Sequence, residues 1–137
     1  MPPISGGCLC GAVRYCIDAP PLWTAYCHCR SCRRATGAPV AAFVGATASS
    51  VTFTAGHRAI HKSSPGVRRG FCSSCGTPLT YESDEAPGEI HFFTGTCDDP
   101  DSLPPARHVW HEAALAWFDT DDSLVRHARG SGRLDDR

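Results

Sequence analysis

The chain has 137 residues, about the usual size of one domain, with 42% hydrophobic residues, 20% charged residues and a formal net charge of −1. We therefore expect one globular domain, and the balanced charge gives no overall field that would attract nucleic acid, which argues against nucleic-acid binding. No apolar run approaches the ~20 residues that span a bilayer, and the first residues lack a signal-peptide pattern, so we expect a cytoplasmic protein without membrane association.

Short alternating segments predict a mainly β fold of antiparallel sheets. Val13, Tyr15 and Ile17 alternate with Arg14 and Cys16, which predicts a half-buried strand. Further strands are predicted over residues 40–46, 50–56, 58–63, 78–83 and 89–96. The 13 glycines and 11 prolines indicate many turns, and therefore few and short helices.

The rest of the chain carries weaker signals. A turn or two of helix is predicted near Cys32 to Ala35, and another short turn from His111, before a strand-like segment at residues 116–120. Residues 1–125 are predicted to form the single domain. Residues 126–137 are polar and rich in glycine, which predicts a frayed tail.

Seven of the nine cysteines fall into three clusters, and the expected reducing compartment favours metal ligands or reactive thiols over disulfides. The clusters are Cys8 with Cys10; Cys27, Cys29 and Cys32; and Cys72 with Cys75. Cys16 and Cys97 stand alone and are expected to be ordinary core or surface thiols.

The pair Cys72 and Cys75, followed by Gly76, is typical of a zinc knuckle, which needs a second pair of ligands. Cys8 and Cys10 can provide that pair, and so can two of the three cysteines between residues 27 and 32. We favour the first arrangement because it uses all seven clustered cysteines. It gives a closed four-cysteine site and a three-cysteine site with one open position, as a catalytic zinc requires.

Other assignments stay open for these cysteines. The three-cysteine set could instead be a second structural site completed by His28 or another imidazole, or a redox trio, and the four-cysteine set could be buried thiols or disulfides. Iron–sulfur ligation is a further alternative, although the spacing between Cys8 and Cys10 and the lack of a compact run of four cysteines disfavour it.

The order of motifs is similar to that of one known family. G-G-C-x-C-G, then C-H-C-x-x-C-R, then F-C-x-x-C-G, and a terminal R-H-V-W-H-E-A-A-L-A-W-F resemble the glutathione-dependent formaldehyde-activating family, also called the centromere protein V group. The resemblance covers residues from about 5 to 118. It implies an Mss4-like β-tent with two zinc ions. The structural zinc ligands would be Cys8, Cys10, Cys72 and Cys75, and the catalytic ligands would be Cys27, Cys29 and Cys32.

The resemblance also implies an activity. The family joins formaldehyde to glutathione to give S-hydroxymethylglutathione, formally a carbon–sulfur lyase reaction in reverse. We therefore expect a zinc-dependent carbon–sulfur lyase that acts on glutathione or a similar thiol and on formaldehyde or a related small carbonyl. The alternative is a non-catalytic zinc module that binds another protein.

The sequence offers several groups for the remaining chemistry. An open three-thiolate zinc suits an incoming thiolate, and a polar group must then protonate the hemithioacetal oxygen. His28, His108 and His111 are the candidates for that proton transfer. Arg30, Arg33 and Arg34 are candidates for pairing with the carboxylates of a tripeptide thiol.

Overall fold

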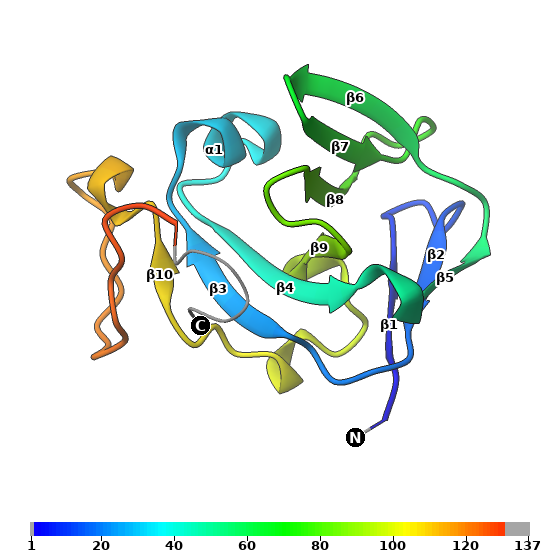
Figure 1. Ribbon diagram of the computed structural model, residues 1–137, viewed down its shortest axis with the longest axis horizontal. Coiled ribbons are helices and arrows are strands. Elements are labelled where there is room, and N and C mark those ends of the chain that lie inside the picture. The colour runs from blue at the N-terminus through cyan, green and yellow to red at the C-terminus, as the bar shows by residue number, and fades with distance from the viewer. Residues whose placement is uncertain (1, 131–137) are drawn as a thin grey trace.

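Two β-sheets dominate the computed structural model, which describes residues 2–130 (Figure 1). The smaller sheet contains three antiparallel strands in the spatial order β1 (Ile4–Gly7), β2 (Arg14–Ile17) and β5 (Val51–Ala55). The larger sheet contains β3 (Trp23–Cys27), β4 (Ala41–Thr47), β6 (Ala59–Ser64), β7 (Val67–Phe71), β8 (Pro78–Ser83), β9 (Glu89–Phe93) and β10 (His108–Val109).

The larger sheet has the strand order β10-β3-β4-β9-β8-β7-β6. Its neighbours are antiparallel, apart from the parallel pair of β10 with β3. The expected mainly β, antiparallel fold is therefore confirmed, with one short parallel pair added at the edge. The sequence pattern missed β1, β3, β7 and β10. β10 has two residues, β1 ends in two glycines, and β7 carries two arginines and a glycine, whereas β3 runs directly into the cysteine cluster.

The main core lies between the two sheets. Tyr15 and Ile17 of β2 pack in one apolar cluster with Val44, Leu79 and Phe92 of the larger sheet. The rings of Tyr15 and Phe92 have centroids 4.2 Å apart. The buried face predicted from the alternation in residues 13–17 is confirmed.

A second, smaller apolar cluster lies on the larger sheet where β3 ends. It contains Cys27, Cys32, Ala41, Phe43 and Phe93, with Trp23, Cys29, Tyr81 and Val109 packed against it. Phe43 belongs to this cluster and its neighbour Val44 to the main core, because successive side chains of a strand point to opposite faces. The larger sheet thus supports the core with one face and the second cluster with the other.

The α-helix of the described chain, α1 (Arg30–Thr36), begins directly after β3. It ends at Gly37, which takes φ 71° and donates its N–H to the Arg33 carbonyl at 2.7 Å, as a left-handed C-cap does. Four single-turn 3₁₀ helices complete the helical content: η1 (Ala48–Ser50), η2 (Thr94–Thr96), η3 (Pro100–Ser102) and η4 (His111–Ala113). The prediction of few, short helices is confirmed. None of the helices in residues 2–130 has the length and apolar character required to cross a membrane.

The strand predicted at residues 116–120 is wrong. This segment contains a turn in which Phe118 donates its N–H to the Leu115 carbonyl at 3.1 Å, and Trp117 is 75% exposed. Its aromatic residues favour a strand, but within residues 2–130 no neighbouring strand pairs with them.

The described part of the predicted tail, residues 126–130, lies alongside β10. His127 donates its N–H to the His108 carbonyl at 2.9 Å, and Trp110 donates to the Arg129 carbonyl at 2.9 Å. This part of the chain therefore has regular backbone partners. Residues 131–137, the rest of that predicted tail, lie outside the described residues.

Candidate functional site

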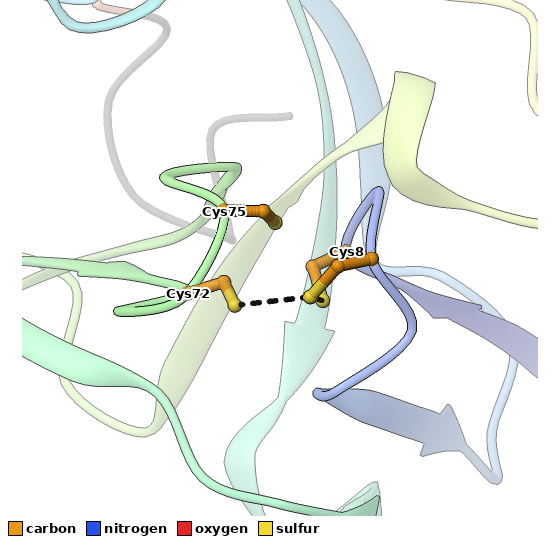
Figure 2. A group of neighbouring side chains, drawn as sticks. Cys8, Cys72 and Cys75 are labelled. Atoms are coloured by element: carbon orange, nitrogen blue, oxygen red, sulfur yellow. Dashed lines mark hydrogen bonds between the residues drawn. The ribbon is translucent and has the colours of Figure 1, made fainter.

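Four cysteines from two distant turns form the first candidate metal site. Cys8 and Cys10 lie in the turn after β1, and Cys72 and Cys75 lie in the turn after β7. Figure 2 shows the side chains of the two turns facing each other, and Cys10 Sγ lies 3.8 Å from Cys72 Sγ. The four sulfur atoms lie within 4.8 Å of one another. The turn at Cys72 closes through the Gly76 N–H, which donates to the Cys72 carbonyl at 2.8 Å while Gly76 takes φ 80°.

Polar neighbours favour thiolates in this four-cysteine group. The Val13 N–H donates to Cys8 Sγ at 3.2 Å, and Thr77 Oγ1 lies 3.1 Å from Cys75 Sγ. The Thr77 hydroxyl and N–H lower the pKa of Cys75 to about 5. The Ala12 N–H lowers the pKa of Cys10, but the Cys8 and Cys75 thiols outweigh it and raise that pKa to about 11. A divalent cation would relieve this competition between thiolates, so the residues fit a metal ion.

The second candidate metal site is built where β3 meets α1. Cys27 is the last residue of β3, Cys29 is the N-cap of α1, and Cys32 lies in its first turn. The Cys32 N–H donates to Cys29 Sγ at 3.2 Å, so the sulfur takes the place that a serine or aspartate oxygen usually has at a helix N-cap. The three sulfur atoms lie within 4.8 Å of one another, with Cys27 Sγ 3.7 Å from Cys32 Sγ.

The three thiols of this group cannot all ionise side by side. The Cys27 and Cys32 thiols stabilise the Cys29 thiolate and lower its pKa to about 2, whereas the Cys29 thiolate raises the pKa of Cys27. Three soft sulfur donors at this separation are the ligand type that zinc takes in proteins. The donor set therefore fits a zinc ion, and in the described chain no histidine or carboxylate joins the three sulfurs as a fourth ligand.

A cavity of about 950 Å³ adjoins the three-cysteine group, and Cys27, Cys29 and Cys32 form part of its lining. Aromatic rings from the larger sheet form another part, namely Trp23, Phe43, Tyr81 and His91. None of the four cysteines of the other group is among the described lining residues. The three-cysteine group thus borders this cavity, and the four-cysteine group does not.

A buried carboxylate fixes two of the aromatic side chains in this cavity. Trp23 Nε1 donates to Glu89 Oε1 at 3.0 Å, and His91 Nε2 lies 3.1 Å from the same oxygen, with the Glu89 side chain only 3% exposed. The His91 ring also stands edge-on to Trp23, with centroids 4.5 Å apart. Sequence reasoning missed His91, because nothing in residues 89–93 distinguishes it from a solvent-facing strand residue.

The three histidines considered for proton transfer lie outside the described lining of the cavity. His28 is buried, and its Nε2 lies 2.8 Å from Nδ1 of His108, which is also fully buried. The His111 ring stands edge-on to His28, with centroids 5.0 Å apart. The geometry therefore does not support a role for these histidines at the reacting atoms.

The hydrogen bonds of His108 set the orientation of His28. His108 Nε2 lies 3.3 Å from the Asp122 carboxylate and 3.1 Å from Thr120 Oγ1. Because an ionised carboxylate can only accept, His108 donates from Nε2 and accepts at Nδ1 from His28 Nε2–H. Burial lowers the pKa of His28 to about 4 and also lowers the pKa of His108, so both rings are neutral near pH 7. These hydrogen bonds between neutral rings hold His28 in place, and His28 lies between the candidate metal ligands Cys27 and Cys29.

The arginines of α1 separate into two environments. Arg30 lines the cavity, whereas Arg33 and Arg34 line a different depression beside Trp117. An arginine that the sequence did not single out, Arg69 of β7, lines the cavity as well and reaches Cys32. Cys97 is buried against the Tyr15 hydroxyl at 3.4 Å, and Cys16 lies on β2; neither belongs to a candidate metal group.

Comparison with known proteins gives consistent matches over most of the chain. Residues 3–113 match the family model described as glutathione-dependent formaldehyde-activating enzyme. A curated relative from Halomonas elongata, provisionally named as an enzyme of that type, is 30% identical over 128 residues, which span 86% of this chain and 81% of the relative.

A solved structure shares the fold. The crystal structure of a Rhodobacter sphaeroides protein matches with a TM-score of 0.57 and 23% identity, over 69% of this chain and 87% of that chain. At this level of identity the similarity concerns the fold alone.

Proposed function

Because the chain belongs to the glutathione-dependent formaldehyde-activating family, we propose that it is a zinc-dependent carbon–sulfur lyase that joins a thiol to a small carbonyl compound. Glutathione is the proposed thiol and formaldehyde or a related small aldehyde the proposed carbonyl, with an S-hydroxymethyl thiol as the product. One observation carries the proposal: Cys27, Cys29 and Cys32 line a cavity of about 950 Å³.

The proposal assigns different tasks to the two cysteine groups. Cys8, Cys10, Cys72 and Cys75 would hold a structural zinc, because four thiolates complete its tetrahedral coordination. Cys27, Cys29 and Cys32 would hold the second zinc with one position left for an exchangeable ligand. When bound there, zinc supplies Lewis acidity that favours the thiolate form of an incoming thiol.

The side chains around the open site fit the remaining tasks. The rings of Trp23, Phe43 and Tyr81 exclude water from one side of the cavity, which strengthens electrostatic interactions inside it. Arg30 at the helix provides a guanidinium for a substrate carboxylate. Holding thiol and carbonyl side by side converts a bimolecular addition into a step within one complex.

The proposal is tested by isothermal titration calorimetry of the zinc-loaded protein with glutathione. We expect heat of binding for the wild type and its loss in Cys29→Ser, with Cys16→Ser as the matched control because Cys16 lies outside both groups. Turnover of formaldehyde with glutathione is then followed by NMR, as appearance of the hydroxymethyl signal. Glutathione binding that persists unchanged in Cys29→Ser refutes the assignment and favours a non-catalytic zinc module.

A further inference from the structure

The guanidinium of Arg69 contacts the three-cysteine group and lines the same cavity. Its Nη1 and Nη2 atoms lie 3.9 and 3.8 Å from Cys32 Sγ, although the two residues are 37 positions apart. Arg69 pairs in register with Tyr81 on β8, and its Cζ lies 5.0 Å from the centre of the Tyr81 ring. The Tyr81 ring thus packs against the guanidinium, whose nitrogens contact Cys32 Sγ.

The arginine beside Arg69 has a very different environment. Arg68 points to the other face of β7 and donates to the Asp84 carboxylate at 2.9 Å. Arg14, Arg58, Arg126 and Arg129 also form ion pairs with carboxylates. Within residues 2–130, no carboxylate lies within ion-pair distance of Arg69, so its cationic charge faces the thiol cluster and the cavity.

We propose that Arg69 is a catalytic residue of this site, whose guanidinium stabilises the anionic charge of the incoming thiolate and of the alkoxide formed when that thiolate adds to the carbonyl. The inference rests on the proposed function and deepens it. It concerns the anion that would bind at the metal, and not the carboxylates of glutathione, because Arg69 Nη2 lies 3.8 Å from Cys32 Sγ, one of the three sulfurs that would hold that metal.

The charges of the site explain why a cation is needed. Three thiolates around one divalent ion leave a formal charge of about −1, and a substrate thiolate makes it about −2. In a cavity with aromatic walls this charge is poorly solvated, so a permanent guanidinium nearby favours binding of the anion. The same cation then faces the oxygen on which negative charge develops.

The addition step is balanced without any further reactant. The thiol releases its proton to solvent, and the sulfur lone pair forms the bond to the carbonyl carbon. The carbonyl π electrons move to oxygen, and this alkoxide takes one proton from solvent to give the hemithioacetal. Arg69 neither gains nor loses a proton in this sequence and acts through its charge and hydrogen bonds.

The test compares two thiols on the cobalt(II)-substituted protein, whose sulfur-to-cobalt absorption band reports a thiolate entering the site. Glutathione carries carboxylates and 2-mercaptoethanol carries none. We expect Arg69→Gln to weaken both thiols alike, by about 10- to 100-fold, since a lost hydrogen bond to a charged group has that effect. Arg68→Gln is the matched control and should bind both thiols as the wild type does, because Arg68 faces Asp84.

Turnover of formaldehyde with the zinc-loaded variants supplies the second readout. At saturating thiol, Arg69→Gln should lower kcat by about 100-fold, as loss of one oxyanion-stabilising donor does, and Arg69→Lys should recover part of that loss. Metal content and circular dichroism are measured first. Should Arg69→Gln lose metal, Arg69→Lys with full metal decides the matter, since it keeps the charge and must retain thiol binding.

Three results would overturn the inference. The first is thiol binding and turnover by metal-loaded Arg69→Gln that equal those of the wild type. The second is weaker binding of glutathione alone in Arg69→Gln, which would make Arg69 a carboxylate-binding residue. The third is the loss of binding of both thiols in metal-loaded Arg69→Lys. If the wild type itself shows no thiol binding at cobalt, the proposed function fails, and that result is distinct from an unchanged Arg69→Gln.

Discussion

The four-cysteine group should control the stability of the whole fold, and Cys75→Ser tests this. The group joins the turn at Cys8 to the turn at Cys72, and both of these cysteines belong to the main core. Among the described residues, the polar contact between the two turns that does not involve a thiol is the Leu9 N–H, which donates to Thr77 Oγ1 at 3.0 Å. Without a metal, little else fixes these turns to each other.

The expected magnitude follows from the ligand count. Structural zinc contributes ~10–16 kcal/mol in small zinc domains, so removing one of four ligands costs about 3 kcal/mol or more. For a domain of this size that corresponds to a decrease in Tm of roughly 10 °C. Complete removal of the metal takes away as much as the ~5–15 kcal/mol net stability of a typical domain, so we expect unfolding.

The assay is thermal unfolding followed by circular dichroism, with zinc content measured on the same samples. Cys16→Ser is the control, because Cys16 is partly exposed like Cys75 but belongs to neither group. A strong chelator should unfold the wild type at ambient temperature. A Tm that does not change after complete loss of zinc would refute the structural assignment.

Three further outcomes are expected. His108→Asn should lower the free energy of unfolding in urea by about 2–3 kcal/mol relative to the exposed control His57→Asn, because it breaks the buried chain from His28 to Asp122; equal stabilities would contradict this role. Burial lowers the pKa of His108, so the unfolded chain takes up a proton as the pH falls through 6.5 before the folded chain does, and the free energy of unfolding should decrease on acidification. In urea titrations at pH 7 and 5.5, the wild type should lose more free energy of unfolding than His108→Asn, and equal losses would exclude this cause. Gly6→Ala should lower Tm strongly, because a Cβ there would lie 2.5 Å from the Thr96 carbonyl oxygen, whereas Gly95→Ala meets no atom within 4 Å and should leave Tm nearly unchanged; similar melting of both variants would argue against close packing at Gly6.

The features that could be predicted from the sequence depend on local spacing. The alternation of Val13, Tyr15 and Ile17 identified a buried face, and the division of seven cysteines into four and three matches the two groups of sulfurs in the structure. A C-x-x-C turn and a helix N-cap are short-range geometries, so the residues between two cysteines largely decide where their sulfurs point.

The features that could not be predicted depend on which strands become neighbours. Arg69 meets Cys32 only because β7 and β8 follow β9 across the larger sheet, and no local pattern distinguishes Arg69 from Arg68. The sequence offered His28 as a possible ligand or proton-transfer group, but it could not show its hydrogen-bond partner His108, which is 80 residues away. Residues 116–120 show the converse error. Their residue types favour a strand, but in the described part of the chain no neighbouring strand pairs with them.

The two cysteine groups illustrate why ligand type alone does not assign a role to a metal site. Both offer only thiolates, and both place their sulfurs within 4.8 Å. They differ in what surrounds them, since Cys8 and Cys72 pack into the main core, whereas Cys27, Cys29 and Cys32 border a cavity that also holds a guanidinium without a carboxylate partner in the described chain. A metal shared by two core cysteines and the cysteines of their turns would stabilise the fold. Thiolates beside a cavity, with a guanidinium in contact with one of them, provide a place where an additional anion is electrostatically favoured. This is the physical basis for assigning the chemistry to the second group.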